Sequence, residues 1–174
     1  MDVYDVLNCQ EHGWRAHAAY HEVGHASVGM SRGAPIIRVT LGIGGFGNSG
    51  TTSGGLTHLD EEQFLSWYRQ DPAASLAFSV AGALSEEQFL GHFVGGGMGE
   101  DLMNWRKCNG LLDGDVMANA EAAMGRTFES VVEDTRSWLK SHHTAVNALA
   151  ARLGEVGELT PTDLDAVLGE ASAS

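Results

Sequence analysis

Two histidines stand four residues apart near the start of the chain, and a glutamate directly follows the first of them. The segment AAYHEVGHAS covers residues 18–27 and contains His21, Glu22 and His25. Residues 14–31 are mostly alanine and other helix-tolerant types, their apolar positions recur every three or four residues, and a Gly and a Pro at positions 33 and 35 end the pattern. We therefore predict a helix over residues 14–31 that carries both histidines.

The spacing of these histidines favours a metal site. Positions four apart in a helix lie nearly above one another, at about 100° per residue, so His21 and His25 can direct two imidazole nitrogens at one zinc ion. Glu22 is rotated off that line, where its carboxylate can serve as general base for a water in the open position of the site. The competing interpretation is that two ordinary histidines lie one turn apart by chance.

A catalytic zinc site needs one more protein ligand. Distance along the sequence does not select it, because the third ligand can come from a separate helix. The residues after His25 are ASVGMSRG, so the HExxHxxGxxH extension is missing and the metzincin arrangement is excluded. The candidates are His58, Asp60, Glu86, Glu87, His92, Glu100 and Asp101.

Two strands are predicted after the first helix. Residues 36–41, IIRVTL, are rich in β-branched types, and residues 55–59, GLTHL, form a second short strand. The glycine- and serine-rich segment between them is expected to be a mobile turn or loop. It lacks the lysine of GxxxxGK[ST], which argues against nucleotide binding there.

The remaining residues are predicted to be mainly helical. Asp71 and the following proline begin a helix that continues to about residue 90, and glycines at positions 95–97 and 99 are expected to break the chain before a third helix from residue 100. Residues 115–153 are predicted to be almost wholly helical, with breaks near Gly125 and Ser141. The segment Thr160–Asp163 has the form of a capping box for a short final helix.

These elements predict an α+β fold that is mostly helical, in which a zincin-like HExxH helix lies beside a small β-sheet and a helical bundle follows. With 174 residues, of which 43% are hydrophobic, the chain is long enough for one domain with a core. We expect a single domain over residues 1–170 and a disordered tail over residues 171–174.

Charge and cysteine content restrict the partners. The formal net charge of -13 would repel nucleic acid and an anionic membrane surface. The two cysteines have no CxxC spacing, which favours free thiols in a reducing cytoplasm over a disulfide framework. The sequence contains no run of about 18 apolar residues, so no membrane segment is predicted. The acidic start MDVYDVLNCQEHGW is unlike a secretory signal. The expected location is cytoplasmic.

Five segments, in this order, resemble the protease domain of the FtsH family of ATP-dependent zinc metalloproteases: AAYHEVGHASVG, PIIRVTLG, SGGLTHLDEEQFL, VAGALSEEQFLG and GGGMGEDLMNW. The terminal stretch VVEDTRSWLKSHHTAVNALAARLGEVGELTPTDLDAVL is similar to the family's long helices and final capped helix. The family pattern supplies an aspartate as third zinc ligand, and the matching position here is Asp101. The chain departs from that pattern at AGALSEE, which lacks the family's arginine, and at GMGE.

The resemblance implies a zinc-dependent endopeptidase in which His21, His25 and Asp101 hold zinc and Glu22 is the catalytic base. The family's membrane helices and ATPase module are missing from these residues, so the expected substrate is a flexible or unfolded polypeptide, with a separate ATPase as a candidate partner. A homo-oligomer is left open. The alternative is a non-proteolytic metal-binding regulatory or interaction protein derived from such a domain, and the retained Glu22 argues against it.

Several further residues have two interpretations. Glu86 or Glu87 either holds a ligating histidine by a hydrogen bond or belongs to a solvated helix face. His58 on the second strand either steadies the tetrahedral intermediate or is an exposed strand residue. His17 and the neighbouring pair at positions 142 and 143 are expected on helix surfaces.

Overall fold

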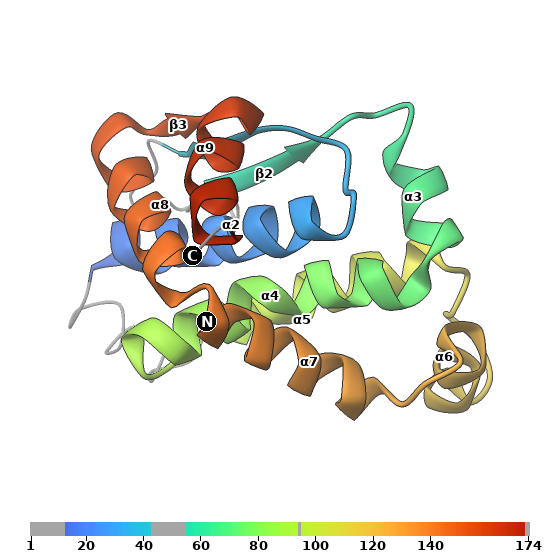
Figure 1. Cartoon of the computed structure of the whole chain (residues 1–174). Coiled ribbons are helices and arrows are strands. Elements are labelled where there is room, and N and C mark those ends of the chain that lie inside the picture. Colours follow the sequence, from blue (N-terminus) through green and yellow to red (C-terminus); the bar gives the residue numbers. More distant parts are fainter. Residues whose placement is uncertain (1–12, 43–54, 94, 173–174) are drawn as a thin grey trace, which may run out of the picture.

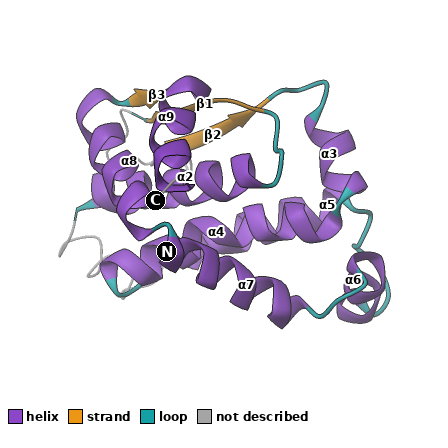
Figure 2. Cartoon of the chain, viewed as in Figure 1, coloured by secondary structure: helices purple, strands orange, loops and turns teal. Residues whose placement is uncertain are grey.

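Helices make up most of the chain, and one small antiparallel sheet lies at an edge of the molecule (Figure 2). This computed structural model describes residues 13–42, 55–93 and 95–172. The predicted α+β fold, mostly helical, is therefore confirmed. The segment expected as a mobile loop lies, apart from its ends, at residues 43–54 and so outside the described residues.

The central helix, α2 (Trp14–Ser31), has the bounds predicted from its alanine-rich sequence. Its buried apolar side chains include Ala19, Val23 and Ala26. Figure 1 shows α2 between the sheet and α4 (Pro72–Leu90). Helix α4 runs along the side of α2 that faces away from the sheet. Because the HEVGH residues lie on α2, this helix places them at the junction of the sheet and the helical layer.

Helix α4 begins and ends as the sequence predicts. The side chain of Asp71 accepts a hydrogen bond from the backbone N–H of Ala74 at 2.9 Å, and Gly91 ends the helix with a left-handed φ of 81°. The approach of α4 to α2 depends on a glycine, because a Cβ at Gly24 would lie 2.5 Å from the carbonyl oxygen of Ala81. Small residues thus let these two helices pack closely.

The sheet has the order β2-β1-β3, with every neighbouring pair antiparallel. Strands β1 (Ile36–Leu41) and β2 (Gly55–Leu59) match the predicted segments. The third strand, β3 (Glu158–Leu159), has only two residues and was not predicted, since so short a segment has no periodicity to detect. Val39 of β1, paired with Leu159, is fully buried and anchors the sheet on the core.

Helix α3 (Phe64–Gln70) follows the sheet and was not predicted. Helix α5 (Gly95–Cys108) begins at Gly95, so the predicted glycine break before residue 100 is wrong. Packing explains the difference: a Cβ at Gly97 would lie 3.0 Å from Cε1 of His21. Glycine is therefore accepted in this helix because it borders the histidine, in spite of its low helix propensity.

The C-terminal third is helical, as predicted, and its helices pack on the earlier ones, with α7 lying along α4 and α8 along α2 (Figure 1). Its helices are α6 (Val116–Met124), α7 (Phe128–Ser141), α8 (His143–Val156) and α9 (Pro161–Ser172). The predicted breaks near Gly125 and Ser141 are confirmed. At the capping box, the N–H of Asp163 donates to Oγ1 of Thr160 at 3.3 Å, and the hydroxyl of Thr160 donates back to Oδ2 of Asp163 at 2.7 Å.

Helix α9 extends to Ser172, into the segment expected to be a disordered tail, and residues 173–174 lie outside the described part. Within the part of the chain that the structure describes, every helix is too short or too polar to cross a membrane.

Candidate metal centre

The two histidines of the HEVGH segment face one another on α2. The Nε2 atoms of His21 and His25 lie 2.9 Å apart, and their ring centroids lie 4.6 Å apart. His25 is buried, with 4% of its surface exposed, and His21 is partly buried. The one-turn spacing has the consequence expected of it, since both ring nitrogens point into the same small space.

The other ring nitrogens determine which atoms carry protons. Nδ1 of His25 lies 2.7 Å from the backbone carbonyl oxygen of Phe78, and Nδ1 of His21 lies 2.6 Å from Oε1 of Glu86. Carbonyl and carboxylate oxygens only accept hydrogen bonds, so both Nδ1 atoms are donors. In the neutral rings the two Nε2 atoms then present lone pairs to one another across 2.9 Å, an arrangement that requires a cation between them.

Asp101, on α5, completes a group of three donor atoms. Its Oδ2 lies 3.2 Å from Nε2 of His21 and 3.2 Å from Nε2 of His25. This oxygen is buried and accepts no hydrogen bond from the described residues. Among those residues, these three side chains are the group of histidine, cysteine and acidic residues arranged to hold a metal ion.

The dimensions and chemistry of this group fit zinc. A tetrahedral zinc ion with ligand bonds of about 2.0–2.1 Å has ligand atoms about 3.3 Å apart, close to the separations of 2.9 and 3.2 Å found here. Two imidazoles and one carboxylate are a ligand set of catalytic zinc sites. A glycine keeps the space beside the nitrogens clear, because a Cβ at Gly82 of α4 would lie 2.5 Å from Nε2 of His25.

The electrostatics of the group favour a positive charge. Burial on its own would lower the pKa of His21, but the nearby carboxylates of Asp101, Glu86 and Glu22 raise the pKa well above its ordinary value. Burial would raise the pKa of Asp101, whereas the neighbouring histidines hold it well below the ordinary value. Both shifts have the same cause, the closeness of carboxylates and imidazoles, and both favour a positive charge in the group, which a proton or a metal ion would supply.

Glu22 is held beside the site by β2. Its side chain is 7% exposed, and the hydroxyl of Thr57 donates a hydrogen bond to its Oε2 at 2.9 Å. A Cβ at Gly55 would lie 2.5 Å from Cγ of Glu22, so the start of the strand must be glycine for the side chain to fit. The strand thus determines the direction of the carboxylate, a contact that the sequence analysis did not predict.

The alternatives for Glu86 and Glu87 are resolved differently. Glu86 is 2% exposed and accepts hydrogen bonds from two histidines, so it does not belong to a solvated face. Glu87 is exposed and pairs with Arg136 at 2.8 Å. Of the two, only Glu86 contacts a histidine of the candidate site.

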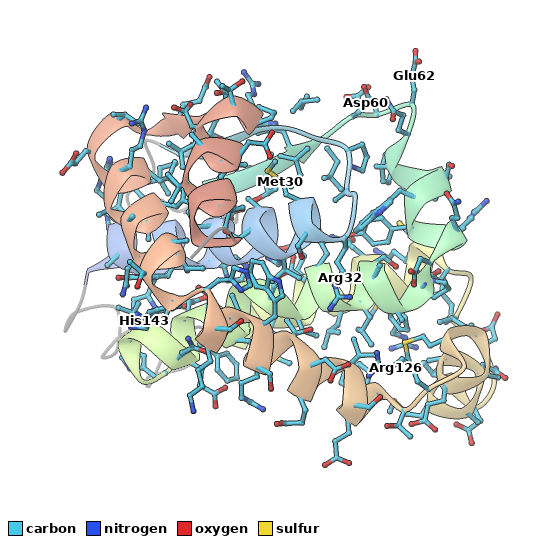
Figure 3. The ribbon with its side chains drawn as sticks, viewed as in Figure 1. Met30, Arg32, Asp60, Glu62, Arg126 and His143 are labelled. Atoms are coloured by element: carbon cyan, nitrogen blue, oxygen red, sulfur yellow. The ribbon has the colours of Figure 1, made fainter. Side chains whose placement is uncertain are left out.

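The other predicted candidates lie apart from the three donor atoms. Asp60, on the turn after β2 (Figure 3), accepts hydrogen bonds from the backbone N–H groups of residues 62 and 63, each at 3.0 Å. His58 follows Thr57 on β2 and so points to the opposite face of the strand, where its Nε2 lies 3.0 Å from Oγ1 of Thr40. Glu100 is exposed on α5.

His17 and His92 form a contact that the sequence analysis missed. His17 was expected on a helix surface, but it is 4% exposed, with Nδ1 at 2.7 Å from Oε2 of Glu86. The expectation was wrong because His17 lies one turn before His21, on the buried face of α2. Nε2 of His92 lies 3.2 Å from Nε2 of His17. The sequence signal for His17 was its four-residue spacing from His21.

Comparison with known proteins adds no family assignment. No protein-family model matches the chain, and no curated protein matches it.

Proposed function

We propose that this chain is a zinc-dependent endopeptidase in which His21, His25 and Asp101 hold the metal ion. The observation that carries the proposal is the meeting of three donor atoms, Nε2 of His21, Nε2 of His25 and Oδ2 of Asp101, separated by 2.9 and 3.2 Å. A site that was only structural would be closed by a fourth protein ligand, and the described residues contribute three.

A zinc ion bound there supplies a Lewis acid that polarises a peptide carbonyl and lowers the pKa of a water molecule toward about 7. Glu22 accepts the proton of the attacking water and then gives it to the amine that leaves. Its position supports this role: the carboxylate lies close enough to His21 to raise the pKa of that ring, and Thr57 limits its rotation.

The proposed substrates are flexible or unfolded polypeptides. Among the described residues β2 pairs only with β1, and an extended backbone could be held along a strand of this kind. None of these residues forms a GxxxxGK[ST] segment, the phosphate loop of ATPases that drive unfolding. Where a folded protein is the substrate, we propose that a separate ATPase delivers it.

The zincin-like arrangement and the relationship to the FtsH protease domain belong to the same proposal. Their support is the order of elements: the HEVGH helix, two paired strands, a helix carrying Glu86 and a glycine-rich helix start that leads to Asp101. The resemblance singles out Asp101 as the third ligand, and Oδ2 of Asp101 lies 3.2 Å from Nε2 of both histidines.

The decisive experiment compares zinc-loaded wild-type protein with Glu22→Gln on an unstructured, casein-like substrate. The variant keeps the three metal-holding side chains, so equal zinc content must first be measured. Cleavage by the wild type and its loss in Glu22→Gln is the expected result. If both proteins hold zinc and neither cleaves, the site needs a specific substrate or partner or is a retained scaffold, and the non-proteolytic metal-binding alternative becomes the better explanation. If the wild type holds no zinc, the metal site itself is refuted.

A further inference from the structure

Glu86 connects the candidate metal centre to a second pair of histidines. One carboxylate oxygen lies 2.6 Å from Nδ1 of His21, and the other lies 2.7 Å from Nδ1 of His17. With 2% of its surface exposed, the carboxylate is out of reach of bulk water. Each oxygen accepts a hydrogen bond from an imidazole N–H group, one from His21 in the candidate metal site and one from His17, a turn earlier on α2.

The proton positions give this connection a direction. Because a carboxylate only accepts, His17 donates from Nδ1 to Glu86 whether its ring is neutral or charged. His92 lies on the far side of the ring, with its Nε2 at 3.2 Å from Nε2 of His17. The hydrogen-bonded series runs from the turn after α4 to the core: His92, His17, Glu86 and finally His21.

From this geometry we propose that His17 is a positioning residue for the metal centre and sets its zinc affinity without touching the ion. The inference rests on the proposed function, since it assigns a task to His17 in the same site. His17 Nδ1–H fixes one oxygen of Glu86, so that the other oxygen stays aligned with Nδ1 of His21. That alignment keeps the lone pair of His21 Nε2 directed at the metal position.

The contribution comes from orientation and solvation. Without the His17 donor, Oε2 of the buried carboxylate loses the hydrogen bond from His17 and is held less firmly in the orientation that faces His21. Residues that orient metal-binding histidines typically change metal affinity about 10–100-fold when they are replaced. His17 is separated from the ion by one more hydrogen bond than Glu86 is, so we expect zinc affinity to fall by about tenfold, the lower limit of this range.

Three substitutions at position 17 separate the donor from the packing. In His17→Asn the amide nitrogen falls near the position of Nδ1 and can donate to Glu86. In His17→Gln the longer side chain carries the amide beyond that position, and in His17→Leu the donor is removed. The control is His143→Leu, which deletes an exposed histidine at the start of α8 (Figure 3) and accounts for zinc bound weakly at the surface.

The measurement is the zinc dissociation constant, obtained by competition with a chromophoric chelator at neutral pH, together with the melting temperature of each metal-free protein. We expect zinc binding to weaken about tenfold in His17→Leu and in His17→Gln, with His17→Asn and His143→Leu within about threefold of the wild type. If His17→Leu does not fold, the comparison between His17→Asn and His17→Gln decides.

Two results overturn the inference while leaving the proposed function intact. In the first, the wild type binds zinc and His17→Leu or His17→Gln binds it with the same affinity. The other is an equal loss in all three position-17 variants that follows the melting temperatures of the metal-free proteins, because His17 then acts by packing alone. A wild type that binds no zinc removes the proposed metal centre and the inference together.

Discussion

The hydroxyl of Thr57 donates a hydrogen bond to the carboxylate of Glu22 at 2.9 Å, and through it β2 determines the direction of the proposed catalytic base. The same hydroxyl lies 3.0 Å from the backbone carbonyl oxygen of Glu22. Thr57 of β2 thus contacts both the carboxylate and the backbone carbonyl of Glu22 on α2. This contact makes the sheet part of the proposed catalytic arrangement.

Thr57→Val should lower kcat/KM for an unstructured substrate about tenfold with zinc content unchanged. The substitution keeps the shape of the side chain but removes a hydrogen bond to a charged group, and a loss of about 1.4 kcal/mol corresponds to this factor. Steady-state cleavage rates and metal analysis on the same samples test the prediction. Thr40→Val on β1, whose hydroxyl lies 3.0 Å from Nε2 of His58, is the matched control and should retain activity.

Gly82→Ala should weaken zinc binding more than tenfold while the helical content is kept. The added Cβ would lie 2.5 Å from Nε2 of His25 and 2.8 Å from Nε2 of His21, in the space beside the donor atoms. Zinc affinity and far-ultraviolet circular dichroism are the measurements. Gly154→Ala in α8 meets no atom within 4 Å, so it should bind zinc normally and gain up to about 1 kcal/mol of stability from helix propensity. Normal zinc binding by Gly82→Ala would contradict the proposed metal position.

Removal of the metal should lower the melting temperature. An ion that binds only the folded state stabilises it by about 2.7 kcal/mol at a free concentration 100 times the dissociation constant, which is worth roughly 5–10 °C for a chain of this size. Thermal unfolding with and without a chelator tests this. Asp101→Ala should melt at one temperature under both conditions, and a chelator effect of wild-type size in that variant would show that the ion binds elsewhere.

Stability should fall between pH 10 and pH 12 because of Tyr68. Burial raises the pKa of this phenol from 10.0 to about 12 in the folded protein. In that interval the unfolded chain loses the phenolic proton and the folded chain keeps it, so the unfolded state is favoured as pH rises. The loss approaches roughly 2–3 kcal/mol by pH 12.

Tyr68→Phe has no such proton. Its free energy of unfolding, measured in urea at several pH values, should decline less steeply than that of the wild type across this interval. The difference between the two proteins at pH 8 gives the cost of losing the hydroxyl itself. Parallel curves above pH 10 would show that the phenol ionises equally in both states.

The sequence was sufficient for features that depend on neighbouring residues. The bounds of α2 followed from its alanine content and apolar spacing, and β1 and β2 followed from β-branched runs between turn residues. The caps at Asp71 and Thr160 were visible for the same reason, since a cap involves residues three positions apart. The relation of His21 to His25 is also local, because one helical turn separates them.

Residues distant in the sequence met only through packing. The alternatives for the third ligand stayed open from the residues alone, and the resemblance to a family, rather than any spacing, singled out Asp101. The helix start at Gly95 contradicted propensity because α5 passes close to His21, where a side chain would collide. The two-residue strand β3 exists only because it pairs with β1.

Tertiary structure also decided the surroundings of the two histidines. From the sequence, Glu86 is one of two equivalent acids on a helix and His17 is a surface residue. The packing of α2 against α4 buries both side chains and places Nδ1 of His17 2.7 Å from Oε2 of Glu86. Helical periodicity specifies which residues share a face, but the partner of that face depends on how two helices cross. The sequence by itself therefore determined the HEVGH helix and its chemistry, whereas the crossing of α2, α4, α5 and β2 determined which carboxylates surround it.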